Sequence, residues 1–261
     1  MIRNACRFRF AQSIGKRRSH LNAALGLSIS LVENNMINDK YRCNQNWSEW
    51  PRCVTNINDI ELDWRWVSFC REGKSHKGIS SFSQQITRLS AKQVNVEFLS
   101  EIAELQNLEY LEIERLSSDT LLPLINLNKL ETLKISGVSK AENFEVLTSL
   151  PNLRYLFIEG AKKLNNLECL SGFTELISLG VEGTMYTNQK VLSLQPISTL
   201  PNLEALFLTS VSLTDKSILC LADLPKIRVL SCARFTTKEH FSSLKSKKPN
   251  IKCRWFEAYE I

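Results

Sequence analysis

The stretch Leu153-Arg154-Tyr155-Leu156-Phe157-Ile158 is the clearest copy of a unit that recurs along most of the chain. Its counterparts begin at Leu108, Leu130, Leu176, Leu203 and Ile227, so successive copies lie 22, 23, 23, 27 and 24 residues apart. A weaker copy, Ile86-Thr87-Arg88-Leu89-Ser90-Ala91, begins 22 residues before the first of these. Because self-similarity at such a period is typical of stacked arrays, we expect a solenoid of near-equivalent turns.

Each copy combines two apolar patterns. In the quoted stretch, Leu156 and Ile158 share one face of an extended chain, while Tyr155 and Phe157 share the other. The residues before it carry apolar side chains three apart: Phe144, Leu147, Leu150 and Leu153. That spacing predicts one stripe of a helical or 3₁₀ turn. Neither surface can be buried alone, so neighbouring turns must stack to form a continuous core.

Over about residues 86–261, these repeats resemble the leucine-rich-repeat family, in its short intracellular class of roughly 22-residue repeats. The resemblance implies an α/β fold, a right-handed solenoid with a parallel concave sheet and short helical or 3₁₀ convex segments. One position departs from the family pattern. Where the family usually has an asparagine that bonds to the backbone of adjacent turns, this chain has Leu116, Val138, Ala161, Thr184, Val211 and Phe235. We therefore expect these turns to satisfy their backbone groups in another way.

Residues 36–85 are predicted to form an N-terminal cap, since a solenoid leaves its first repeat exposed. They are rich in aromatic residues: Tyr41, Trp47, Trp50, Trp64, Trp66, Phe69 and Phe82. Alternation of apolar and charged residues over 60–66 predicts a half-buried strand. The alternative is a set of exposed aromatic anchors for a partner. At the other end, Arg254 stands where a core leucine belongs, which predicts a closing repeat.

Residues 1–35 differ from the rest and are predicted to be a disordered, targeting or extension segment. They carry six basic residues against Glu33 alone, a net +5, and the other 226 residues carry only +1. This distribution does not indicate a nucleic-acid-binding body. The segment has features of a secretory or transit peptide, or it precedes a true start at Met36. We expect a cytoplasmic protein, or a secreted or organellar one if residues 1–32 are a targeting signal.

The sequence gives no indication of a membrane span, a metal, a cofactor or an enzyme. No apolar run reaches the roughly 18 residues that a membrane-spanning helix needs. His20, His76 and His240 are scattered, without zinc-site spacing, and no nucleophile motif occurs. The eight cysteines form no CxxC pair. We interpret them as reduced thiols in a reducing compartment, with Cys232 in the core, although a Cys43–Cys53 disulfide stays open.

The residues between the core positions are predicted to form columns on the concave face. The first runs Tyr110, Thr132, Tyr155, Ser178, Ala205 and Val229; the second runs Glu112, Lys134, Phe157, Gly180, Phe207 and Ser231; the third runs Glu114, Ser136, Glu159, Glu182, Thr209 and Ala233. Exposed aromatics beside carboxylates would suit a basic protein partner. The candidate partner-binding residues are Tyr110, Glu112, Glu114, Tyr155, Phe157, Glu159, Glu182 and Phe207. The alternative is that these aromatics only stabilise cross-strand packing.

The function that the resemblance implies is a non-catalytic scaffold for protein–protein interaction. An insertion over 185–191 lengthens one repeat and is either a binding loop or neutral. A narrower hypothesis is a bacterial immunity-type protein that neutralises a basic toxin. An enzyme with its activity in residues 36–85 is the alternative from a different class, and fold alone does not choose the partner.

Overall fold

The computed structural model describes residues 40–43, 50–257 and 259. The expectations for residues 1–35 lie outside this part of the chain. The chain divides into two units, Met1–Lys40 and Tyr41–Ile261, and the sheet and the helices that pack on it lie in the second unit. No helix among the described residues is long and apolar enough to cross a bilayer.

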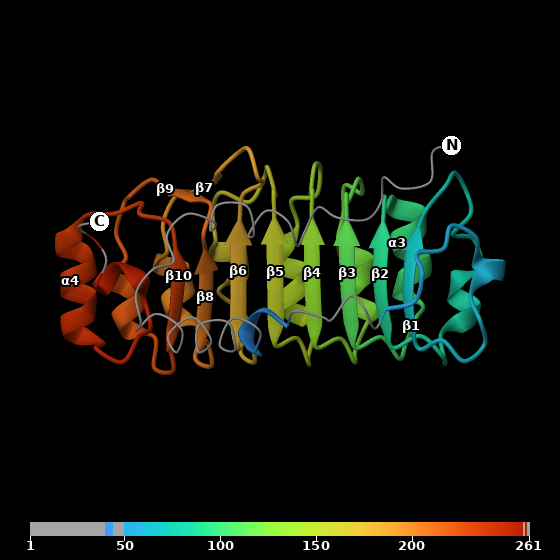
Figure 1. Cartoon of the computed structure of the whole chain (residues 1–261), viewed down its shortest axis with the longest axis horizontal. Helices are drawn as coiled ribbons and strands as arrows, with labels where there is room; N and C mark the ends of the chain where they lie inside the picture. Colours follow the sequence, from blue (N-terminus) through green and yellow to red (C-terminus); the bar gives the residue numbers. More distant parts are fainter. Residues whose placement is uncertain (1–39, 44–49, 258, 260–261) are drawn as a thin grey trace, which may run out of the picture. The chain divides into compact units, whose positions relative to one another are not determined.

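The second unit is built on an eight-stranded parallel sheet in which each strand lies beside the next in the order β1-β2-β3-β4-β5-β6-β8-β10 (Figure 1). The strands are β1 (Trp66–Cys70), β2 (Arg88–Lys92), β3 (Tyr110–Glu114), β4 (Thr132–Ser136), β5 (Tyr155–Glu159), β6 (Ser178–Glu182), β8 (Ala205–Leu208) and β10 (Val229–Cys232). The insertion over 185–191 contributes β7 (Gln189–Val191), which pairs with β9 (Val211–Leu213) in a second, two-stranded sheet.

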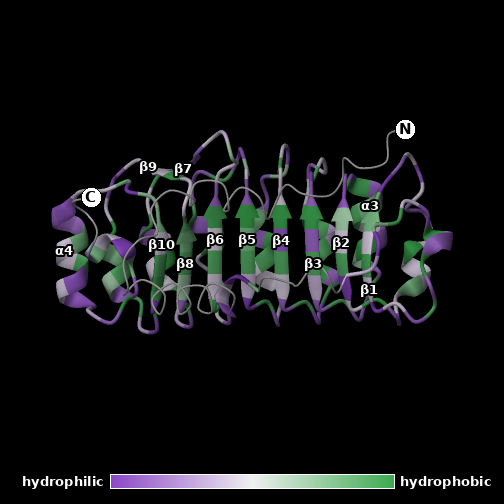
Figure 2. Cartoon of the chain, viewed as in Figure 1, coloured by the Kyte–Doolittle hydropathy of each residue, from purple (hydrophilic) through white to green (hydrophobic). Residues whose placement is uncertain are grey.

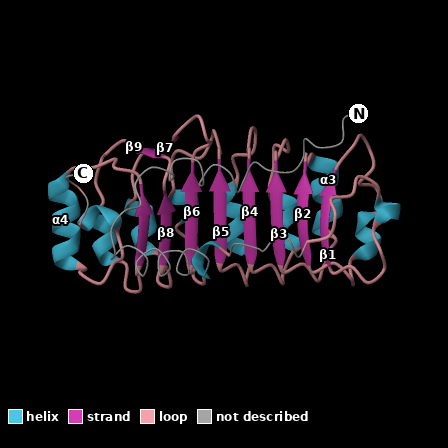
Figure 3. Cartoon of the chain, in the orientation of Figure 1, coloured by secondary structure: helices cyan, strands magenta, loops and turns pink. Residues whose placement is uncertain are grey.

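The opposite side of each turn is a short helical segment, as the three-residue spacing predicts (Figure 3). The 3₁₀ helices that follow the strands are η4 (Leu122–Asn126), η5 (Phe144–Ser149), η6 (Glu168–Leu170), η7 (Gln195–Thr199) and η8 (Leu219–Asp223). Nearer the ends lie η2 (Ile57–Asp59), η3 (Ile79–Phe82), α3 (Val96–Ala103), α4 (Lys238–Lys247) and η9 (Arg254–Phe256). Helices α3 and α4 begin at side-chain caps, Asn95 for α3 and Thr237 for α4.

The core lies between the sheet and these helical segments. In β5, Leu156 and Ile158 are buried, and so are Phe144 and Leu147 of η5. Hydrophobic residues recur along the strands of the sheet (Figure 2). The buried apolar residues form one continuous cluster from Val54 to Cys253. Since each buried leucine contributes about 1.5–3 kcal/mol, several per turn together offset the cost of ordering that turn.

Backbone groups at the turns without the family asparagine are satisfied by the neighbouring turns. Ser117 N donates to Val94 O at 2.8 Å, and Ser139 N donates to Leu116 O at 3.3 Å. A different asparagine ladder supports the array, one residue before the first leucine of a strand. Its side-chain amides each donate to a carbonyl of the preceding turn: Asn107 to Gln84, Asn152 to Asn128 and Asn202 to Thr174.

The strand predicted over 60–66 is wrong. That segment is a turn in which Leu62 is 87% exposed, and β1 begins only at Trp66. Trp66 pairs with Arg88 one repeat later, which places Val67 and Phe69 in the core beside β2. The repeat interval, and not the local alternation, therefore decides where the first strand begins.

At the C-terminal end, the repeat spacing aligns Arg254 with a core leucine, but the structure shifts this register by one residue. Lys252 pairs with Val229, so Cys253 takes the next position and is buried, while Arg254 is exposed and begins η9. This register is one residue out of step with the spacing of the earlier repeats. It is favoured because a buried, unpaired arginine is costly, whereas a cysteine packs as a small apolar side chain.

Candidate functional site

The predicted columns on the concave face are confirmed by the register of the strands. Tyr110, Thr132 and Tyr155 lie in line across β3, β4 and β5, and the line continues through Ser178 to Ala205. The second column likewise joins Glu112, Lys134, Phe157, Gly180 and Phe207. All eight candidate residues therefore lie on strands β3, β5, β6 and β8 of one sheet face, on the side away from the core.

The expectation that the aromatic residues are exposed is wrong. Tyr110 is 3% exposed and Phe207 is fully buried, while Tyr155 and Phe157 are half-buried. Part of the cover is the chain's own N-terminal region, because the Trp50 ring lies 5.8 Å from that of Tyr110. Residues 41–43 lie in front of the sheet (Figure 1), where they contact β4, β6, β8 and the residue before β8.

The most specific of these contacts is made by Arg42. Its two terminal nitrogens donate to the two carboxylate oxygens of Glu182, each at 3.1 Å, and its guanidinium lies 4.3 Å from the centroid of the Phe207 ring. The Thr209 amide and hydroxyl also donate to Glu182. Burial alone would raise the pKa of Glu182, but the Arg42 charge and these hydrogen bonds hold it below its usual value. We call Glu182, Phe207 and Thr209 the arginine seat.

Gly180 of β6 shapes the floor beside this seat. It lies between Phe157 of β5 and Phe207 of β8 in the second column, and the two rings meet across it with centroids 5.9 Å apart. A Cβ atom at Gly180 would come within 2.5 Å of Phe157 Cδ1. The missing side chain therefore lets aromatic rings from two strands pack together over the third.

A second polar cluster lies nearer the start of the sheet. Lys134 donates to the Cys43 carbonyl at 3.1 Å, and its Nζ lies 5.5 Å from the Phe157 ring centroid and 5.8 Å from that of Tyr110. The Tyr110 hydroxyl donates to Glu112 at 3.1 Å. Burial raises the pKa of Glu112 and lowers that of Lys134, and the attraction between the two charges opposes both shifts. Both net shifts favour the neutral forms, so the attraction between the two charges offsets only part of the cost of burying them.

Much of the negative charge predicted on this face meets cations of the same chain. Glu182 binds Arg42, Glu114 lies 2.9 Å from Lys92, and Glu112 faces Lys134. Within the described residues, Glu159 makes no ion pair. Burial, and then the nearby charge of Glu182, raise its pKa. Among the predicted carboxylates, the ionised form of Glu159 is therefore the one that a bound cation would stabilise most.

Sequence reasoning did not identify Tyr41 and Arg42 as part of this face. The Tyr41 hydroxyl donates to Glu204 at 2.7 Å, and burial together with this bond raises the pKa of Tyr41 to about 12. The contacts of Tyr41 and Arg42 join positions 163 and 140 residues apart. A repeat pattern carries no signal for such contacts, because the residues that make them lie outside the repeats.

The remaining predicted features concern the cysteines and the histidines. Cys232 is buried, as predicted, and Cys53 is a free thiol, so the Cys43–Cys53 disulfide is not formed. His76 is buried beside Phe98, and no cluster of three potential metal ligands occurs among the described residues.

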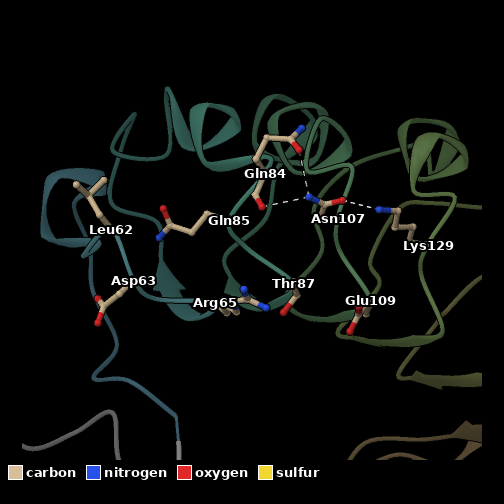
Figure 4. Close-up of a pocket in the computed structure, with 9 residues that line it drawn as sticks. All are labelled: Leu62, Asp63, Arg65, Gln84, Gln85, Thr87, Asn107, Glu109 and Lys129. Carbon is tan, nitrogen blue, oxygen red and sulfur yellow. Dashed lines mark hydrogen bonds between the residues drawn. The ribbon is translucent and has the colours of Figure 1, made fainter.

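A polar cavity of about 580 Å³ lies at the turns that precede strands β1 to β4 (Figure 4). Its lining residues are Leu62, Asp63, Arg65, Gln84, Gln85, Thr87, Asn107, Glu109 and Lys129. Asn107 and Lys129 there bond along the asparagine ladder, with Lys129 Nζ donating to Asn107 at 2.6 Å. The cavity therefore belongs to the support of the array.

The sequence matches no family model and no curated protein. Solved structures do match. An internalin (InlF) of Listeria monocytogenes is 20% identical, with a TM-score of 0.51 over 73% of this chain and 56% of that one. A leucine-rich-repeat protein of Leptospira interrogans is 16% identical, with a TM-score of 0.53 over 77% of this chain and 57% of that one.

The chain thus spans little more than half the length of these two proteins. At such identities the likeness concerns the fold, and it agrees with the parallel order of short strands backed by 3₁₀ helices. The chain therefore has the fold of a leucine-rich-repeat solenoid.

Proposed function

We propose that this solenoid is a non-catalytic scaffold that binds a protein partner through its concave face. The observation that carries the proposal is that the face already holds polypeptide. The Tyr41 hydroxyl, the Arg42 guanidinium and the Cys43 carbonyl are bound by Glu204, Glu182 and Lys134. Glu204, Glu182 and Lys134 are not part of the core cluster, so the core does not depend on them.

The chemistry of the face favours a basic partner. A carboxylate with an aromatic ring beside it suits a guanidinium, which pairs with both carboxylate oxygens and stacks on the ring. Half-buried Tyr155 and Phe157 add apolar area next to Glu159. We therefore propose that an arginine-bearing segment of the partner contacts the candidate residues Tyr110, Glu112, Glu114, Tyr155, Phe157, Glu159, Glu182 and Phe207.

The proposal predicts that Phe157→Ala with Glu159→Lys weakens binding of an arginine-rich peptide at least about tenfold, because an aromatic anchor and an attractive charge are lost together. Fluorescence anisotropy with a labelled arginine-rich nonapeptide, and a glutamate-rich one for comparison, measures this. The thermal midpoint should stay nearly unchanged, since neither side chain is in the core cluster.

The matched control is Val146→Ala with Glu145→Lys on η5, the opposite side of the solenoid. It makes the same change of charge and also removes one apolar side chain, and it should leave binding unchanged. Equal loss of binding in both double variants would place the site away from the concave face.

A further inference from the structure

We infer that residues 41–43 are an internal ligand of the concave face, so that the arginine of a partner binds by displacing Arg42 from the arginine seat. This inference rests on the proposed function, because it names how access to that same face is regulated. Three observations support it: the fit of the seat to a guanidinium, the nature of the contacts that hold the segment, and the carboxylate beside the seat.

The seat fits arginine specifically. Two parallel N–H···O bonds of 3.1 Å to Glu182 require a planar group with two donors on one edge. The ring of Phe207, 4.3 Å from the guanidinium carbon, provides the stacking surface. A lysine ammonium has neither the fork nor the flat face, so the seat distinguishes arginine from other cations.

The contacts of the segment are of a kind that another chain can replace. Its contacts with the face include those of a hydroxyl, a guanidinium and a carbonyl, and the Tyr41 side chain is also buried. The continuous apolar cluster begins at Val54 and includes none of residues 41–43. The Arg42 side chain keeps 27% of its surface exposed, which gives a competing group access to the seat.

A carboxylate that the competing arginine can contact first lies next to the arginine seat. Glu159 is paired in register with Glu182 on the neighbouring strand, and it has no ion pair within the described residues. An incoming arginine can therefore approach Glu159 while Arg42 still occupies Glu182, and then exchange. This arrangement makes the partner's affinity depend on the fraction of molecules in which Arg42 has left the seat.

The test uses the peptide acetyl-Gly-Ser-Tyr-Arg-Ser-Gly-amide and its citrulline analogue, which keeps the shape but lacks the charge. Binding is measured by NMR titration to millimolar concentration with the full chain and its Arg42→Ala and Arg154→Ala variants. Arg154 is exposed on the loop before β5, so its replacement makes the same charge change away from the seat. The arginine peptide should bind Arg42→Ala about tenfold more tightly than the other two proteins, by the population argument.

The outcomes distinguish the internal-ligand inference from the proposed function. Equal affinity for all three proteins overturns the internal-ligand inference and leaves the proposed function in place. Absence of binding to every protein, Arg42→Ala included, overturns the proposed function with it. Equal binding of the citrulline peptide overturns the arginine specificity of the seat. If Arg42→Ala does not fold, Arg42→Lys keeps the charge without the bidentate fork and should show the same direction of change.

Discussion

At the scale of single residues, the concave face shows how an absent side chain can matter as much as a present one. The position of Gly180 between two aromatic residues allows the rings of Phe157 and Phe207 to meet. Its place in the second column was predictable from the repeat. Its role was not, because the approach of Phe157 depends on side-chain packing across three strands.

Gly180→Ala should therefore weaken the arginine seat without unfolding the chain. The new Cβ would force Phe157 away from Phe207, and we expect a loss of about three- to tenfold in affinity for the arginine peptide, the scale of one aromatic contact. NMR titration measures the affinity, and thermal unfolding measures the stability. Gly172→Ala is the control, because a Cβ there meets Thr148 at an ordinary distance of 3.4 Å. A Gly180→Ala variant that binds like the Gly172→Ala variant would contradict the packing role.

At the scale of elements, the interior repeats were predictable and the end repeats were not. Apolar residues, mostly leucines, recur at similar intervals and define β3 to β6, β8 and β10, because every one of these strands buries the same face. In β1 the core positions are Val67 and Phe69, so the leucine pattern does not mark them. The asparagine ladder of Asn107, Asn152 and Asn202 lies at a position that the family pattern does not specify.

The first elements also contain a pH-sensitive residue. His76 precedes η3 and packs on Phe98 of α3, with ring centroids 5.1 Å apart. It is 1% exposed, and its ring nitrogens have no hydrogen-bond partner among the described residues. Burial, and then the charge of Arg71, lower the pKa of His76 below 6.5. The unfolded chain therefore binds the proton more readily than the folded one.

We expect the contribution of neutral His76 to the free energy of unfolding to be fully present above about pH 6.5. It should be lost as the pH falls below that value, by up to about 1.4 kcal/mol per pH unit. Urea unfolding between pH 7.5 and 5.5 measures this loss. His76→Phe, which keeps an aromatic ring beside Phe98, should remove this part of the pH dependence. Identical pH profiles for the variant and the native chain would show that His76 does not titrate in this window.

At the scale of the whole molecule, the repeat period predicts the stacked array of strands. It does not predict which residues cover the concave face of that array. The columns of the concave face follow from the repeat interval, which is why their register was predictable. The cover comes from Arg42 and Trp50, residues outside the repeats whose partners lie far along the chain. This cover is part of the reason why exposed aromatics were predicted and buried ones are found.

The reactivity of Arg42 toward phenylglyoxal, followed by mass spectrometry with Arg154 as the internal reference, tests the central claim most directly. A guanidinium held by Glu182 and Phe207 should react much more slowly than the exposed Arg154 in the native chain. Saturation with the arginine peptide should then raise the Arg42 rate toward that of Arg154. Equal rates at the two arginines, unaffected by the peptide, would contradict an arginine-binding concave face occupied by the chain itself.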